Sequence, residues 1–190
     1  DVLDVDQGDA LVVAAGDLMR ALGDAPVLKA TCGARPLREV LLSITTHLHE
    51  GLSNGIHVDP ASGLVYSPAH FTWMDTNHPA ATPRRGYPVE IQALWIAGLA
   101  LLRERLGETR FAETEARARA ALPRLYRMPG GWLADSLRAE PGQPAAQAVA
   151  EDALRPNQLL AVTLGAIPAA DPGARAIIDA CAGLLVPGAL

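Results

Sequence analysis

The stretch PVEIQALWIAGLALLRERLG, Pro88–Gly107, predicts a helix with clear signals at both ends. Pro88 suits the first position of a helix, and Gly107 suits the position just after its last turn. Between them, apolar residues recur at the three- and four-residue spacing of one helix face. They are Ile91, Leu94, Trp95, Gly98 and Leu102. We therefore expect this segment to pack against a hydrophobic core.

Five further segments carry helical signals on either side of this one. They cover residues 9–22, 36–50, 110–126, 156–164 and 171–184. Asp9 is the expected N-cap of the first, where Leu11, Ala15, Leu18 and Leu22 recur at helical spacing. Asp171 followed by Pro172 is a typical cap and first turn for the last. No run of alternating apolar and polar residues predicts a strand, so we expect an all-α protein.

The composition indicates a single globular domain. The 190 residues are 49% hydrophobic and 19% charged, which is enough apolar material for a substantial core. The net charge of -5 and the scattered arginines offer no basic surface for a phosphate backbone, so we expect no nucleic-acid partner. Cys32 and Cys181 are too few for a disulfide framework and have no metal-ligand spacing. We expect neither a metal site nor a cofactor.

The first residues, DVLDVDQGD, are acidic and lack the basic and apolar regions of a secretory signal. The most apolar windows are interrupted by Gln92 or by charged residues before they reach the length of a membrane span. We therefore expect a cytoplasmic protein that does not associate with a membrane.

Two of the connections between the expected helices are unusually long. The second-to-third connection covers residues 52–87, and the fourth-to-fifth covers residues 128–155. Because alternate connections of antiparallel helices emerge at the same end, both long loops should lie on one face. Long loops on a helical scaffold often carry the functional residues of a protein. These two contain Trp73, Asp75, Arg84, Arg85, Trp132 and Asp135.

The loops and the helix starts beside them carry a series of motifs that resembles a known family. In chain order the motifs are Gly55–Asp59 (GIHVD), Thr72–Asp75 (TWMD), Thr82–Gly86 (TPRRG), Pro88–Ile91 (PVEI), Ala93–Trp95 (ALW) and Leu154–Leu159 (LRPNQL). Their order resembles the glucosidase domain of glycogen debranching enzymes of the archaeal and bacterial type. The resemblance spans nearly all 190 residues. It departs after Asp4–Asp6, where Ala10, Leu11 and Val12 stand in place of the family's usual aromatic residues.

The resemblance implies a fold and an activity. The implied fold is an (α/α)6 barrel, of which residues 1–190 would form about half, and the catalytic domain would continue past Leu190. The implied activity is that of an amylo-alpha-1,6-glucosidase, which removes the single glucose left at a glycogen branch point. The expected partner is glycogen or another branched alpha-glucan. A half-barrel would expose apolar helix faces, so we also expect a homodimer through them.

The implied chemistry requires two carboxyl groups. One donates a proton to the departing glycosidic oxygen, and the other activates water on the opposite face of the sugar. In an inverting enzyme, which the resemblance implies, the two groups stand about 6.5 to 9.5 Å apart. Asp75 matches the general acid of the family, and the apolar Trp73 and Met74 beside it would favour its protonated form. The base is expected beyond this chain, so residues 1–190 alone should hydrolyse little or no substrate.

Other residues of the motifs suit the binding of a sugar. A tryptophan offers an apolar surface for the C–H face of a glucose ring, while arginine, glutamate and side-chain amides hydrogen-bond its hydroxyls. The expected substrate-binding residues are Trp73, Arg84, Arg85, Glu90, Asn157 and Gln158.

Structural and functional alternatives accompany these assignments. Arg84, Arg85 and Glu90 are equally suited to a structural ion pair, Trp73 to filling the top of the barrel, and Arg155 and Asn157 to anchoring a loop. The activity could instead be that of another inverting (α/α)6 glycosidase of the glucoamylase, trehalase or mannosidase type. The chain could also be a non-catalytic, carbohydrate-binding helical fragment.

Overall fold

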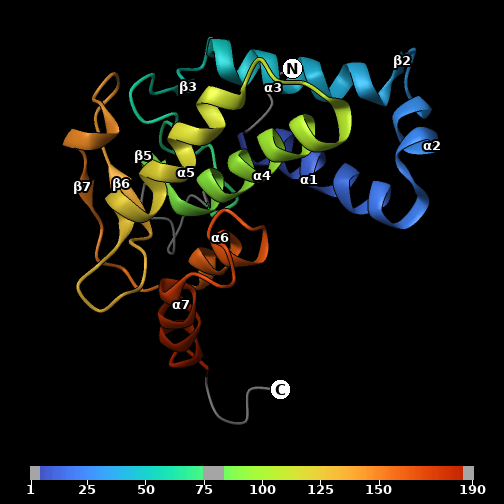
Figure 1. Cartoon of the computed structure of the whole chain (residues 1–190). Coiled ribbons are helices and arrows are strands. Elements are labelled where there is room, and N and C mark those ends of the chain that lie inside the picture. The colour runs from blue at the N-terminus through green and yellow to red at the C-terminus, as the bar shows by residue number, and fades with distance from the viewer. Residues whose placement is uncertain (1–4, 75–83, 186–190) are drawn as a thin grey trace.

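The computed structural model describes residues 5–74 and 84–185, which form a mostly helical protein with short β-hairpins (Figure 1). The α-helices in these residues are α1 (Val5–Leu22), α2 (Asp24–Lys29), α3 (Leu37–Glu50), α4 (Val89–Leu106), α5 (Ala112–Tyr126), α6 (Leu159–Thr163) and α7 (Pro172–Ala182). The strands are β1 (Thr31–Cys32), β2 (Arg35–Pro36), β3 (His57–Val58), β4 (Val65–Tyr66), β5 (Gly86–Pro88), β6 (Ser136–Arg138) and β7 (Val149–Ala150). Two short 3₁₀ turns are η1 (Ala145–Gln147) and η2 (Pro156–Gln158). The predicted helical character is confirmed, and the expected absence of strands is wrong.

Helix α4 is the centre of the fold. It contacts α1, α3, α5 and α6, and Figure 1 shows it between α5 and α6. Its core residues lie on nearly every side of the helix and include Ile91, Ala93, Trp95, Ile96, Leu99 and Leu102. The predicted end at Gly107 is confirmed, because this glycine takes the left-handed conformation typical of a helix C-terminus. A helix that is buried on nearly every side can hold the loops at its ends in place.

Helix α1 differs from the prediction in its start and in its buried face. It begins at Val5, so Asp9 is not an N-cap but a buried residue inside the helix. The core side consists of Val12, Ala15 and Met19, whereas Leu11, Leu18 and Leu22 are exposed. Both sides of α1 are apolar, so periodicity alone could not show which one packs. Contact with α4 is close enough that a Cβ at Gly16 would lie 2.9 Å from Leu101 Cδ1.

Helices α3, α5 and α7 begin within two residues of their predicted starts, whereas α6 begins at Leu159, because the residues from Pro156 form a 3₁₀ turn before it. Asp171 caps α7, because its Oδ1 accepts a hydrogen bond of 2.7 Å from the Gly173 amide. Pro36 and Pro88 precede α3 and α4 instead of opening them, because each lies in a short strand. The described parts of the chain contain no helix with both the length and the apolar character needed to cross a membrane.

The short strands join the two long loops. In the three-stranded sheet β5–β6–β7, Tyr87 pairs with Leu137, and Pro88 pairs with Ser136. Because β5 ends the first long loop and β6 lies in the second, both loops meet at the N-terminal end of α4, as predicted. Strands of two or three residues contain too little alternation to be seen in the sequence.

The hairpin β3–β4 of the first long loop is hydrogen-bonded to the side of α4. The Gln92 amide oxygen accepts from the Val65 N–H at 2.8 Å, and its Nε2 donates to the Val65 carbonyl at 2.9 Å. One turn later, Trp95 Nε1 donates to the Gly63 carbonyl at 3.1 Å. All these groups are buried. The side chain of Gln92 therefore satisfies the backbone N–H and C=O of Val65, as a further strand beside β4 would do.

We predict that Gln92→Leu destabilises the protein by about 2–4 kcal/mol, because it leaves the buried N–H and C=O of Val65 without partners. The exposed Gln147 is the matched control, and Gln147→Leu should change stability by less than about 0.5 kcal/mol. Urea unfolding followed by circular dichroism measures both. Equal midpoints for the two variants would show that the hairpin does not depend on Gln92.

Candidate functional site

A buried cluster of charged residues lies where the two long loops meet at the start of α4. We call it the Asp135 cluster, and it consists of Arg84, Glu90, Asp135, Arg155 and Asn157. Arg84 lies two residues before β5, Asp135 directly precedes its paired strand β6, and Glu90 lies in the first turn of α4. Asn157 lies in the η2 turn that leads into α6, and Arg155 directly precedes that turn. Four separate segments therefore supply one site.

Asp135 is the centre of this cluster. Its Oδ2 lies 2.9 Å from Arg84 Nε and accepts a hydrogen bond of 2.8 Å from Arg155 Nη1. Its Oδ1 accepts a hydrogen bond of 2.9 Å from Asn157 Nδ2. The Asp135 side chain is 0% exposed, so these three groups replace water around a buried carboxylate.

Arg84 joins Asp135 to the helix. Its guanidinium makes a two-pronged contact with Glu90, with Nη1 paired to Oε1 and Nη2 at 2.7 Å from Oε2. Nη2 also donates to the backbone carbonyl of Asp135 at 3.0 Å. That carbonyl accepts the Val89 N–H at 3.0 Å as well, and so satisfies one of the backbone donors at the start of α4.

The cluster is balanced in charge. Two arginines face two carboxylates, and the side chains of Arg84 and Glu90 are each 1% exposed. Burial alone lowers the pKa of Arg84, but Glu90 and Asp135 outweigh that effect and raise the pKa above its ordinary value. Arg84 therefore stays charged. Removing these charges from water costs free energy. Loss of one member would therefore destabilise the protein, because it would leave another buried charge without its partner.

The structure gathers some of the predicted sugar-binding residues and separates others. Arg84, Glu90 and Asn157 belong to the Asp135 cluster. Gln158 is not part of the cluster but bonds the backbone beside it. Its amide accepts a hydrogen bond from the Leu133 N–H and donates one to the Arg155 carbonyl, both at 2.9 Å. Arg85 points away from the cluster and pairs with Glu140 at the surface. Whether any of these side chains contacts a sugar stays a prediction.

The TWMD motif leads directly to the cluster. Trp73 is 63% exposed, whereas the sulfur of Met74 lies 3.0 Å from Asn157 Nδ2. Asp75, the predicted general acid, lies outside the described residues. It follows Met74 in the sequence, so the last described residue before it is in contact with the cluster.

Sequence reasoning missed the central role of Asp135. The sequence analysis places this residue on the second long loop and assigns it no role, whereas the structure buries it. One local signal was available: Leu133, Ala134 and Leu137 are apolar and make a buried loop segment plausible. The partners Arg84 and Glu90 come from other segments, so no local pattern could identify them. Met74 was counted only as apolar surface beside Asp75.

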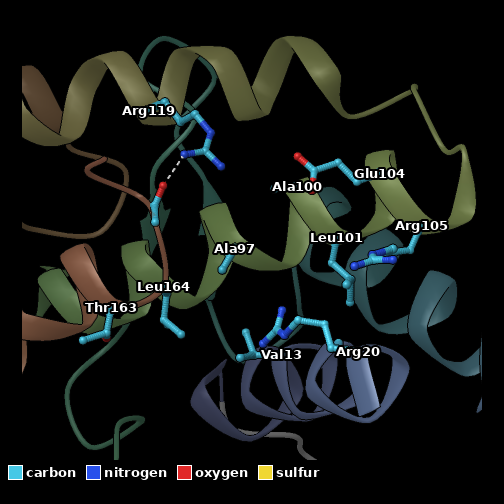
Figure 2. A pocket seen from close by; sticks show the side chains of 12 residues that line it. Val13, Arg20, Ala97, Ala100, Leu101, Glu104, Arg105, Arg119, Thr163 and Leu164 are labelled. Atoms are coloured by element: carbon cyan, nitrogen blue, oxygen red, sulfur yellow. Dashed lines mark hydrogen bonds between the residues drawn. The ribbon is translucent and has the colours of Figure 1, made fainter. Parts of the chain in front are cut away.

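A pocket of about 390 Å³ lies elsewhere, between α1, α4 and the end of α6 (Figure 2). The predicted site residues are not among its lining residues. Figure 2 shows Arg119 above the pocket and Arg20 below it on α1, and Arg119 donates a hydrogen bond to the Gly165 carbonyl. Its arginines already have acidic partners in the chain: Arg20 pairs with Asp17, Arg105 with Asp24, and Arg119 with Glu115. Within residues 5–74 and 84–185, no three His, Cys, Asp or Glu side chains come close enough together to hold a metal ion.

The fold and the site together define a mostly helical domain that presents polar and aromatic loop residues at one end of its core helix. Residues 10–190 match the family described as amylo-alpha-1,6-glucosidase. The chain therefore belongs to the amylo-alpha-1,6-glucosidase family, as its motifs predicted. No curated protein and no solved structure matches the chain.

The neighbouring arginines 84 and 85 provide a test of the cluster. We predict that Arg84→Met costs about 3–5 kcal/mol, because it leaves Glu90 and Asp135 buried with fewer partners. Arg85→Met should cost less than about 1 kcal/mol, because the side chains of Arg85 and Glu140 are 42% and 67% exposed. Chemical denaturation of both variants measures the difference. Similar losses would contradict the distinction between a buried and a surface pair.

Proposed function

We propose that this chain is part of a glycoside hydrolase domain that removes alpha-1,6-linked glucose at glycogen branch points. The observation that carries the proposal is the family match over residues 10–190. The position of the TWMD motif supports it, because the motif runs from an exposed tryptophan to a methionine seated on the Asp135 cluster. The substrate would be glycogen or another branched alpha-glucan.

In the proposed reaction, Asp75 gives a proton to the departing glycosidic oxygen. A second carboxylate activates water on the other face of the sugar, and the anomeric configuration inverts. Glu90 and Asp135 are unsuited to that second role. Both are buried, and their oxygens are taken up by Arg84, Arg155 and Asn157, so a water molecule has no free carboxylate oxygen to bind. We therefore propose that the base lies outside residues 1–190.

Two exposed side chains suit substrate binding. The ring of Trp73 is largely in solvent, where it can pack against the apolar face of a hexose. Arg85 is partly exposed, and its guanidinium has donors to spare beyond its contact with Glu140. In contrast, Arg84 is enclosed by the cluster. Arg84 would contribute to binding indirectly, by holding in place the loop that carries Arg85.

The proposed fold is an (α/α)6 barrel, of which this chain supplies about half. Helix α4 fits an inner helix of such a barrel, because it is buried on nearly every side. Helix α1 exposes Leu11, Leu18 and Leu22. These leucines suit contact with a neighbouring helix from the other half of the barrel. A second copy of the chain could cover the same leucines, so the homodimer stays a prediction.

Two rival functions remain. One is an inverting glycosidase of the same barrel type with another sugar or linkage, such as a trehalase-like, glucoamylase-like or mannosidase-like enzyme. The other is a helical module that binds a glucan without hydrolysing it. The substrate range and the effect of removing Asp75 separate these functions from the proposed one.

We predict that the full-length gene product releases glucose from a singly branched dextrin and not from trehalose. Asp75→Asn should lower kcat on the dextrin by about 10²–10⁴-fold, because the leaving oxygen then receives no proton. The exposed Asp152 on the second long loop is the control, and Asp152→Asn should keep wild-type activity. Glucose release from each substrate measures both effects.

Three results would contradict the proposal. Glucose release from trehalose alone would indicate a different linkage, and binding of dextrin without hydrolysis would indicate a binding module. Glucose release by residues 1–190 alone, abolished by Asp75→Asn, would place the base inside this chain.

A further inference from the structure

The side-chain amide of Asn157 connects the Asp135 cluster to the TWMD motif. Its Nδ2 donates to Asp135 Oδ1 at 2.9 Å and lies in contact with Met74 Sδ at 3.0 Å. Met74 and Asn157 are 83 positions apart in the sequence. This contact is therefore a bridge between the end of the described first loop and the turn that leads into α6.

Asn157 is itself held in place. It is 7% exposed and lies in the η2 turn, which begins with Pro156 and is secured by the hydrogen bonds of Gln158. Asp135 also fixes which way the amide faces. An ionised carboxylate only accepts hydrogen bonds, so the NH₂ end of Asn157 must turn toward Asp135. The same NH₂ group then presents its second hydrogen toward the sulfur of Met74.

This use of the amide leaves little for a sugar. An asparagine NH₂ group has two hydrogens, and its two contacts are the Asp135 carboxylate and the Met74 sulfur. Only the carbonyl oxygen of the amide remains, on a side chain that is almost fully buried. The arrangement suits a residue that fixes the backbone of another better than one that recognises a ligand.

We propose that Asn157 is a positioning residue that acts through Met74 on Asp75, with Asp135 orienting its amide. The inference rests on the proposed function, in which Asp75 is the general acid. A general acid transfers its proton only when it lies within hydrogen-bond reach of the leaving oxygen. A displacement of about 1 Å can cost 10²-fold in rate, so fixing the residue before Asp75 has a direct effect on the chemical step.

The test uses Asn157→Ala, Met74→Leu and the double variant in the full-length gene product. Each is assayed on a singly branched dextrin and on alpha-glucosyl fluoride, whose fluoride ion departs without needing a proton from the enzyme. We expect Asn157→Ala to lower kcat on the dextrin by about 10–100-fold with KM within about twofold. On the fluoride, kcat should change by less than about threefold, because that reaction needs much less help from a general acid.

The double variant distinguishes a shared contact from two separate effects. Met74→Leu keeps the volume of the side chain and removes the sulfur, so it should fold and lower kcat on the dextrin by about tenfold. The double variant should be as active as the less active of the two single variants, because both changes remove the same contact. Asn54→Ala is the control and should keep wild-type activity, since the Asn54 amide oxygen accepts a hydrogen bond from the Ile56 N–H within its own turn.

Several outcomes would overturn the inference. A rise in KM with unchanged kcat would make Asn157 a sugar ligand, and an equal loss on both substrates would indicate a general structural defect. Additive losses in the double variant would show that Met74 and Asn157 act separately. Thermal melting shows whether Asn157→Ala folds. If it does not, Met74→Leu is the test: an equal loss of kcat on the dextrin and on the fluoride, or no loss on either, would overturn the inference. A wild-type protein that hydrolyses neither substrate would instead contradict the proposed function.

Discussion

Burying the Asp135 carboxylate is the constraint on which the arrangement of the loops depends. A charge with no access to water is tolerated only when ion pairs and hydrogen bonds surround it. Here the partners are Arg84, which lies just before β5, and Arg155 and Asn157, which lie at the η2 turn, so the carboxylate is satisfied only when both segments have reached their final positions. Desolvation makes such a network a modest source of stability. Its geometric requirement nevertheless excludes most other ways of folding two long loops over the same helix.

Helix α4 makes that arrangement possible. Its first turn supplies Glu90 to the cluster, and its next turns supply Gln92 and Trp95 to the β3–β4 hairpin. One helix therefore holds both the first half and the end of the first long loop, through side chains on different sides. Almost complete burial of α4 among α1, α3, α5 and α6 prevents it from shifting, because a packed core has few alternative arrangements.

The sequence was informative where structure is local and uninformative where it depends on distant partners. The ends of α4 and α7 could be predicted, because Gly107 and Asp171 act within a few residues of themselves. The buried side of α1 could not, since Val12 and Leu11 are both apolar and only contact with α4 distinguishes them. For the site, the motifs predicted that Arg84, Glu90 and Asn157 bind a sugar, and the structure places all three in one buried cluster. Their common partner, Asp135, was not recognised, because it lies 51 positions from Arg84 in the sequence.

The TWMD motif shows how a site can combine a fixed residue with an accessible one. Met74 is seated on the amide of Asn157, whereas its neighbour Trp73 is largely exposed. Anchoring Met74 restricts the backbone of Trp73 as well, so the ring can be accessible to a ligand without being free to adopt many positions. A ligand that packs on such a ring has less disorder to remove, which improves affinity without any added contact. In the proposed reaction, the Asp135 cluster would act in the same way on Asp75, by holding Met74 before it without itself touching the substrate.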